Sequence, residues 1–135
     1  LRADGSTIQP TPELQGIGIT TKAIKQSILL DNTSSATTIQ DFSALAGKSL
    51  TIKYKIVRGT LDRSGELVIS ASTTGVNYDD TYTESSSDVG VTLSASMSNE
   101  DSTAGNETVA LKYVTTNTGG SPGNATLDYQ TTIIV

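Results

Sequence analysis

The clearest hydrophobic pattern in the chain lies in residues 48–72, KSLTIKYKIVRGTLDRSGELVISAS. In each half of this stretch, apolar and polar residues alternate with the period of a β-strand that buries one face. The apolar positions are Leu50, Ile52, Tyr54 and Ile56 in the first half and Leu67, Ile69 and Ala71 in the second. Residues 59–65, GTLDRSG, are mostly small or polar and predict a hairpin loop. The stretch therefore predicts two antiparallel strands at the centre of the fold.

Arg58 breaks this pattern, because it continues the parity of the apolar residues in the first strand. A lone buried charge is costly, so the side chain must reach water at its tip or pair with a carboxylate. A hairpin brings Glu66 near it, and we predict a structural ion pair between Arg58 and Glu66. Asp62 and Asp80 are the other candidate partners, and a guanidinium that reads a ligand is the alternative role.

Five more segments have the alternation or the composition of strands, and turn residues separate them. They are residues 19–32, 36–40, 89–97, 109–115 and 125–135. In the first of them Ile24, Ile28 and Leu30 share one parity, and we expect them to face the core. Phe42 and Leu45 are expected to cover the core from a connection. With the hairpin, this gives about seven or eight strands, which favours an all-β fold, an antiparallel β-sandwich of jelly-roll or immunoglobulin-like type.

The sequence divides into two parts. Residues 1–20 contain Pro10 and Pro12, which disfavour a helix, and we interpret them as a tether from an upstream segment. Residues 21–135 form the predicted sandwich domain. Because the sequence opens on Leu1 and has no signal peptide, we expect a processed protein or a domain of a longer chain.

Composition narrows the classes of function. The net charge of −5 and the pI near 4.5 argue against nucleic-acid binding, which needs a basic surface. The lack of Cys and His removes thiolate nucleophiles, the commonest metal ligand and the commonest general base. We therefore predict no enzymatic activity, no metal and no cofactor. No apolar run approaches the ~20 residues that span a bilayer, so membrane insertion is not expected.

The predicted core is lean, because aromatic residues make up only 4% of the chain and Trp is absent. We therefore expect part of the stabilising burial to come from a partner subunit.

Residues 73–88, TTGVNYDDTYTESSSD, are interpreted as the longest irregular region, and they hold the candidate binding residues. We predict that Tyr78, Asp80 and Tyr82 contact a ligand, because tyrosine offers stacking area and a hydroxyl group at low entropic cost. The alternative is that one or both tyrosines lie over the edge of the sandwich.

The same region is rich in carboxylates: Asp79, Asp80, Glu84 and Asp88. Carboxylate oxygens suit Ca²⁺, but these residues lack the spacing of a calcium loop. A glycosidase pair is the weaker alternative, because an exposed loop offers no environment that raises a pKa. Solvated acidic side chains are the simplest interpretation.

Three stretches of the sequence resemble a known family: SLTIKYKIVRGT with RSGELVIS, then DVGVTLS, then VALKYVTTNTGGSPGNATLDY. They are similar to a β-sandwich domain of virion proteins of tailed phages and phage-like particles, among them tail fibre and other appendage proteins. The resemblance covers about residues 27–135. It implies an extracellular structural or adhesive module on the particle surface, often a homotrimer, and it supplies no catalytic residue. A shared fold does not by itself fix a function.

The leading hypothesis is a non-enzymatic domain of a phage or phage-like tail fibre, trimeric, near the tip and in contact with a cell-surface glycan or protein. Its other expected partners are virion or fibre proteins. The second hypothesis is a capsid decoration protein, which cements shell proteins together. The third is a free carbohydrate-binding or glycan-hydrolysing domain.

Overall fold

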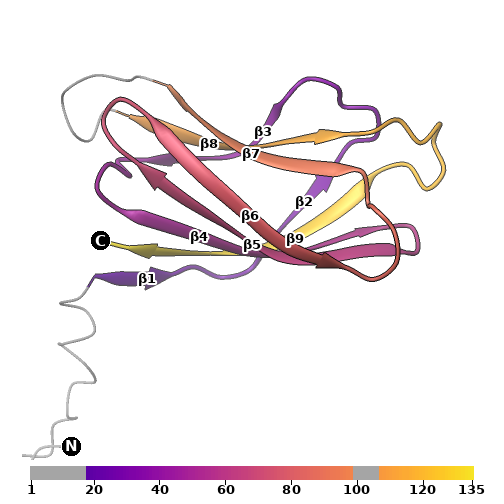
Figure 1. Cartoon of the computed structure of the whole chain (residues 1–135), viewed down its shortest axis with the longest axis horizontal. Coiled ribbons are helices and arrows are strands. Elements are labelled where there is room, and N and C mark those ends of the chain that lie inside the picture. Colours follow the sequence, from indigo (N-terminus) through magenta and orange to yellow (C-terminus); the bar gives the residue numbers. More distant parts are fainter. Residues whose placement is uncertain (1–17, 99–106) are drawn as a thin grey trace, which may run out of the picture.

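A computed structural model describes residues 18–98 and 107–135, and within them the chain forms two antiparallel sheets packed face to face (Figure 1). The predicted all-β sandwich is confirmed. The strands are β1 (Ile19–Thr21), β2 (Lys25–Leu29), β3 (Thr37–Ser43), β4 (Ser49–Arg58), β5 (Leu61–Ala71), β6 (Val76–Glu84), β7 (Val91–Ser98), β8 (Thr108–Thr115) and β9 (Ala125–Ile134). In this part of the chain no helix is long and apolar enough to cross a membrane.

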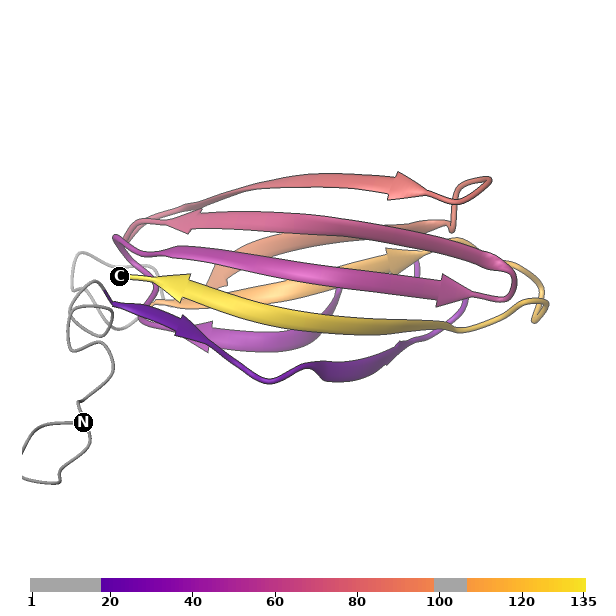
Figure 2. The ribbon, with the colours of Figure 1, turned by 90° about the horizontal axis from the view of Figure 1, so that it is seen from below.

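The two sheets differ in width. The larger has the order β1-β9-β4-β5-β6, with β2 also paired to β9, and the smaller has the order β3-β8-β7. Figure 2 looks onto the outer face of the larger sheet, with β6 along one margin and the indigo strands β1 and β2 along the other. Three strands cannot cover the whole inner face of a wider sheet, so the margins of the larger sheet stay partly open.

The alternation predicted for the central hairpin is confirmed. Every second residue of β4 from Leu50 to Arg58 is buried, and so are Leu67 and Ile69 on β5. The predicted loop at 59–65 is too long, however. The turn is Gly59-Thr60, with Gly59 at φ 63°, and β5 begins at Leu61.

The core is built from the inner faces of both sheets, as the alternation predicts. Buried residues beyond the central hairpin include Phe42, Leu45, Val89, Val91, Leu93, Val109, Leu111, Tyr113, Leu127 and Tyr129. Phe42 lies within β3 rather than in a connection, because β3 runs to Ser43.

The set of residues predicted to face the core in residues 19–32 is wrong. The segment forms two short strands, and Leu29 is the residue that enters the core. Ile24, Ile28 and Leu30 are 70%, 51% and 54% exposed. The register explains the shift, because Leu29 lies opposite the buried Ala125 of β9 and Ile28 lies opposite Thr126.

The predicted tether, residues 1–20, lies mostly outside the described residues. Of its residues, Ile19 and Thr20 belong to β1 and pair with Ile134 and Ile133 of β9. The backbone N–H of Val135 donates to the carbonyl of Gly18 at 3.0 Å, so the two ends of the described chain lie together (Figure 2).

The irregular region predicted at 73–88 is also corrected, because most of it is the strand β6. Its side chains are exposed or partly exposed on both faces, so hydrophobic alternation is absent. An edge strand needs little burial, and its residues Val, Tyr and Thr have high strand propensity. The content of strand-favouring residues, rather than alternation, is therefore the signal that could have predicted β6.

Candidate functional site

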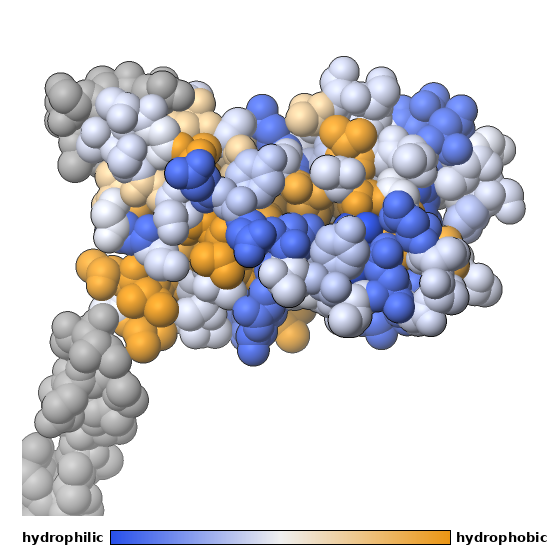
Figure 3. Space-filling model, viewed as in Figure 1, coloured by the Kyte–Doolittle hydropathy of each residue, from blue (hydrophilic) through white to orange (hydrophobic). Residues whose placement is uncertain are grey.

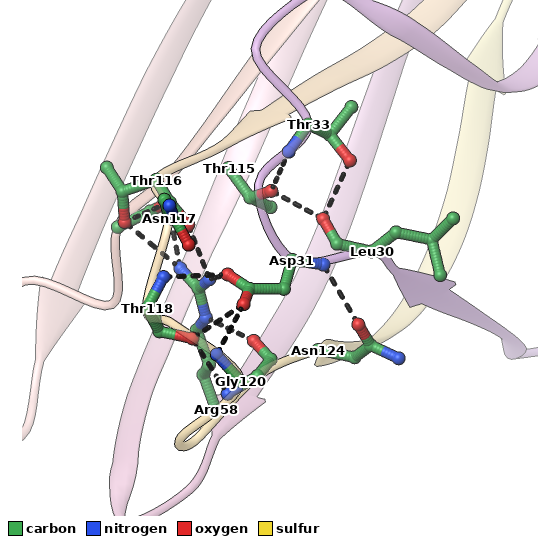
Figure 4. Close-up of polar contacts among 12 residues, drawn as sticks. Leu30, Asp31, Thr33, Arg58, Thr115, Thr116, Asn117, Thr118, Gly120 and Asn124 are labelled. Atoms are coloured by element: carbon green, nitrogen blue, oxygen red, sulfur yellow. Dashed lines mark hydrogen bonds and ion pairs between the residues drawn. The ribbon is translucent and has the colours of Figure 1, made fainter.

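Arg58 lies at the centre of a polar network that joins three loops at one end of the sandwich (Figure 4). The side chain is fully buried. Its Nε donates to the carbonyl of Gly123 at 2.8 Å, and its Nη1 donates to the carbonyl of Val89 at 3.0 Å. Its Nη2 donates to Asp31 Oδ1 at 2.6 Å and to the carbonyl of Thr116 at 2.7 Å. These bonds satisfy the guanidinium within the protein.

Asp31 is the ion-pair partner of Arg58, in the turn after β2. Its carboxylate also accepts bonds from the Thr118 backbone N–H at 2.9 Å, the Thr118 hydroxyl at 2.8 Å and the Gly120 N–H at 3.1 Å. Desolvation favours a higher pKa, but these donors and the Arg58 charge outweigh it and lower the pKa of Asp31. The carboxylate therefore holds the loop between β8 and β9 in place.

The predicted pair between Arg58 and Glu66 is wrong. The β4–β5 register places Arg58 opposite Leu61 and Glu66 opposite Lys53. Glu66 lies 3.7 Å from the Lys53 ammonium, and both side chains are exposed. The structural role predicted for Arg58 agrees with its burial and its internal bonds.

The Asp31 network predicts an acid-sensitive contribution to stability. Because its pKa is lower in the folded state, Asp31 stabilises the fold above its unfolded pKa, and this contribution is lost as pH falls through the folded pKa. The Asp31→Asn variant should therefore lose less stability than the parent between about pH 6 and pH 2. Urea unfolding across this range measures the difference.

Asp80→Asn provides a control with the opposite sign. Burial raises the pKa of Asp80, although the bond from Tyr54 and the charge of Arg63 lower it. Asp80 therefore adds stability as pH falls through its folded pKa, and removing it should steepen the acid loss. If both variants had the same acid profile as the parent, neither carboxylate would be coupled to folding.

The predicted binding residues Tyr78, Asp80 and Tyr82 all lie on one face of β6, and we call them the β6 strip. The register places them opposite Ile69, Leu67 and Gly65 of β5. Directly opposed residues share a face of the sheet, so the strip lies on the inner face. The strip is at the margin of the larger sheet, where Tyr78 and Tyr82 remain 47% and 45% exposed. The structure thus brings the three residues together on a strand rather than in a loop.

A second buried arginine supports the strip. The Arg63 guanidinium lies 3.9 Å from the centre of the Tyr82 ring, a cation–π distance. Its Nε and Nη2 donate to Glu84 Oε2 at 3.1 and 3.0 Å, and its Nη1 donates to the carbonyl of Val91 at 2.8 Å. Arg63 is only 2% exposed, so it fixes one end of the strip against the core.

Tyr54 and Gly65 support the middle of the strip. The buried Tyr54 hydroxyl donates to Asp80 Oδ1 at 2.7 Å, and burial together with this carboxylate raises the pKa of Tyr54. A Cβ on Gly65 would lie 2.6 Å from Tyr82 Cβ and 2.8 Å from Tyr54 Oη. Because glycine has no Cβ, it leaves room for the side chains of Tyr54 and Tyr82 to lie close to the β5 backbone at this position.

The carboxylates considered as alternative calcium ligands form no metal-binding cluster in the described residues. No group of three or more His, Cys, Asp or Glu with metal-binding geometry occurs in residues 18–98 and 107–135. Glu84 and Asp88 both contact Arg63, and Asp88 also caps the Gly90 N–H at 2.8 Å. The carboxylates of Glu84 and Asp88 thus stabilise the connection between β6 and β7.

Sequence reasoning missed Arg63, Asp31 and Tyr54 as members of these networks. Arg63 has the same parity as Leu67 and Ile69, which is the signal that could have found it. Asp31 is distant from Arg58 in sequence and reaches it only through the pairing of β2 and β4 with β9. Within the described residues, no buried side-chain nitrogen or oxygen lacks a hydrogen-bond partner.

Comparison with known proteins yields one structural neighbour. No family model and no curated protein matches the chain. Among solved structures, it is similar to the tailspike protein gp49 from Acinetobacter baumannii bacteriophage Fri1, a capsular polysaccharide depolymerase, with 11% identity and a TM-score of 0.36. The match covers 83% of this chain and 17% of that chain. This chain therefore corresponds to a small part of the tailspike's length.

Proposed function

We propose that this chain is a structural and adhesive module of a phage or phage-like tail fibre, exposed on the particle surface and assembled as a homotrimer. The resemblance of residues 27–135 to virion appendage domains supports the class of protein. The structural observation that supports the proposed homotrimer is a row of exposed aliphatic side chains along one margin of the larger sheet.

This row, the aliphatic edge, follows β1 and β2 and includes the adjoining end of β9. Its members are Ile19, Ile24, Ile28, Leu30 and Ile134, and each is 45% or more exposed. Figure 3 shows part of it as apolar atoms gathered where β1 begins and β9 ends. Several exposed aliphatic side chains along one margin of a domain with a lean core are typical of a protein contact.

A second copy of the chain fits this edge. A shallow hollow of about 250 Å³ lies beside Ile24, lined by side chains that include Lys53, Lys55 and Asp128. In a closed ring of three copies, each hollow can receive an aliphatic side chain from one neighbouring copy. Burying each half-exposed aliphatic side chain contributes on the order of 1 kcal/mol, so several together sustain a subunit contact.

The proposed role is binding rather than catalysis. The carboxylates closest to the two buried arginines, Asp31 and Glu84, are occupied by internal donors and hold loops in place. The exposed part of the strip offers stacking rings and an acceptor, which suits a sugar or a protein side chain. Adhesion therefore belongs to the β6 strip, at the margin opposite the aliphatic edge.

Light scattering coupled to size exclusion tests the assembly. The parent chain should be a trimer at micromolar concentration, and Ile24→Ser combined with Ile28→Ser should give a monomer. The control is Val68→Ser, because Val68 is also exposed, at 38%, but lies on β5 away from the edge. A parent chain that stays monomeric contradicts the assembly, and a serine variant that stays trimeric moves the contact to another surface.

A further inference from the structure

The β6 strip has the spacing of an extended binding platform. Tyr78, Asp80 and Tyr82 are at alternate positions of a strand, so each Cα lies about 7 Å from the next on the same face. The two rings therefore stand at the ends of the platform, with the carboxylate between them. A ligand that contacts all three must be elongated and must offer flat apolar faces and polar donors.

The platform is held rigid from below, and this rigidity lowers the entropic cost of binding. The ring of Tyr82 is stacked on Arg63, whose bonds to Glu84 and to the carbonyl of Val91 prevent it from moving away. Asp80 Oδ1 accepts the Tyr54 hydroxyl, and no hydrogen bond occupies Oδ2 among the described contacts. One carboxylate oxygen is thus anchored by Tyr54, and the other is left as an acceptor for a ligand.

The charge around the platform is negative. Asp79 lies on the same strand, and Glu84 and Asp88 follow within a few residues. Arg63 contacts both Glu84 and Asp88, but it is buried and leaves Asp79, on the other face of the strand, without this counter-charge. An anionic ligand would therefore meet several carboxylates within one Debye length, about 8–10 Å at physiological salt.

We propose that the β6 strip binds neutral or amino-sugar polysaccharide and discriminates against glycans rich in uronic or sialic acid. Sugar rings stack on Tyr78 and Tyr82, and a hydroxyl or ammonium group between them donates to Asp80. This selectivity rests on the proposed adhesive function and adds the chemical class of the ligand to it. The stacking sets affinity for all sugars, whereas the acidic surroundings decide among them.

Calorimetric titration of the full chain with three oligosaccharides of matched length tests the selectivity. The probes are chitosan oligomers, N-acetylated chito-oligosaccharides and oligogalacturonate, which are cationic, neutral and anionic. Chitosan should bind most tightly and lose affinity with added salt, the neutral probe should bind independently of salt, and oligogalacturonate should not bind. Tight binding of oligogalacturonate overturns the selectivity while leaving adhesion intact.

Substitutions on the strand locate the site. Tyr78→Ala and Tyr82→Ala should each weaken both binding probes by roughly tenfold. Asp80→Asn should weaken chitosan more than the neutral probe, because it removes charge and keeps an acceptor. Thr81→Ala, on the other face of the same strand, is the matched control and should change nothing. Binding that survives both tyrosine variants overturns the site, and no binding by any probe overturns the polysaccharide ligand, whereas adhesion to a protein would be left intact.

Discussion

Replacing Arg58 with methionine is expected to lower the free energy of unfolding by about 3–5 kcal/mol, the usual cost of removing one partner of a buried ion pair. The expected cost is large because methionine keeps the aliphatic bulk but supplies none of the donors. The carbonyls of Gly123, Val89 and Thr116 would each lose the donor that Arg58 supplies, and Asp31 would lose its counter-charge. Urea unfolding of the parent and the variant measures the difference.

Lys112→Met is the matched control, because Lys112 lies on β8, outside the aliphatic edge, with its side chain on the partly exposed face of the strand. We expect it to change stability by less than about 0.5 kcal/mol. Arg58→Lys should recover only part of the loss, since an ammonium keeps the charge but cannot reproduce the planar fork. Oligosaccharide affinity should stay unchanged in the folded Arg58 variants. A loss below about 1 kcal/mol for Arg58→Met, or a larger effect on binding than on stability, would contradict the structural role.

The burial of Arg58 was predictable from the sequence, and its partner was not. Parity alone places Arg58 on the core face, because the side-chain period of a strand is two. The partner depends on which strands are neighbours, and β4 pairs with β9 as well as with β5. The hairpin alone therefore pointed to Glu66, which the register places opposite Lys53. The network instead recruits Asp31 from the turn that follows β2, on the far side of β9.

Two segments of the larger sheet show where alternation fails as a signal. In and beside β2 the exposed aliphatic residues Ile24, Ile28 and Leu30 outnumber the single buried one, Leu29, so the pattern favours the wrong face. In β6 neither face is fully buried, so the strand carries no apolar alternation at all. Both strands lie at margins of the sheet, where tertiary packing rather than alternation decides which side chains are exposed. The central strands β4, β5 and β9 follow their patterns because the smaller sheet covers them.

The two buried arginines act on the same short segment. Arg58 donates to the carbonyls of Val89 and Gly90, and Arg63 donates to the carbonyl of Val91. These three residues lead into β7, the margin of the smaller sheet that faces β6. The larger sheet thus fixes the start of β7 through charged donors rather than through apolar packing alone.

Replacing Arg63 with methionine is expected to cost about 3 kcal/mol of unfolding free energy, at the lower end of the range for buried pairs. The cost should be smaller than for Arg58, because the side chains of Glu84 and Asp88 are 19% and 77% exposed and water can solvate them. The Val91 carbonyl would lose its donor, and the Tyr82 ring would lose the guanidinium beneath it. Denaturant unfolding of the parent and the variant measures the change in unfolding free energy.

Arg63 also connects stability to binding, and the two effects can be separated. If the guanidinium positions Tyr82, Arg63→Met should weaken binding of the neutral chito-oligosaccharide severalfold in protein that is still folded, whereas Arg58→Met should not. Glu84→Gln is the matched control, since it removes the charge of the partner while Arg63 remains beneath the ring. If the Arg63 variant bound the probe like the parent, the ring would be positioned by its own strand alone. If it bound more weakly than the Glu84 variant at equal folded fraction, the cation–π contact would be the element that joins the core to the strip.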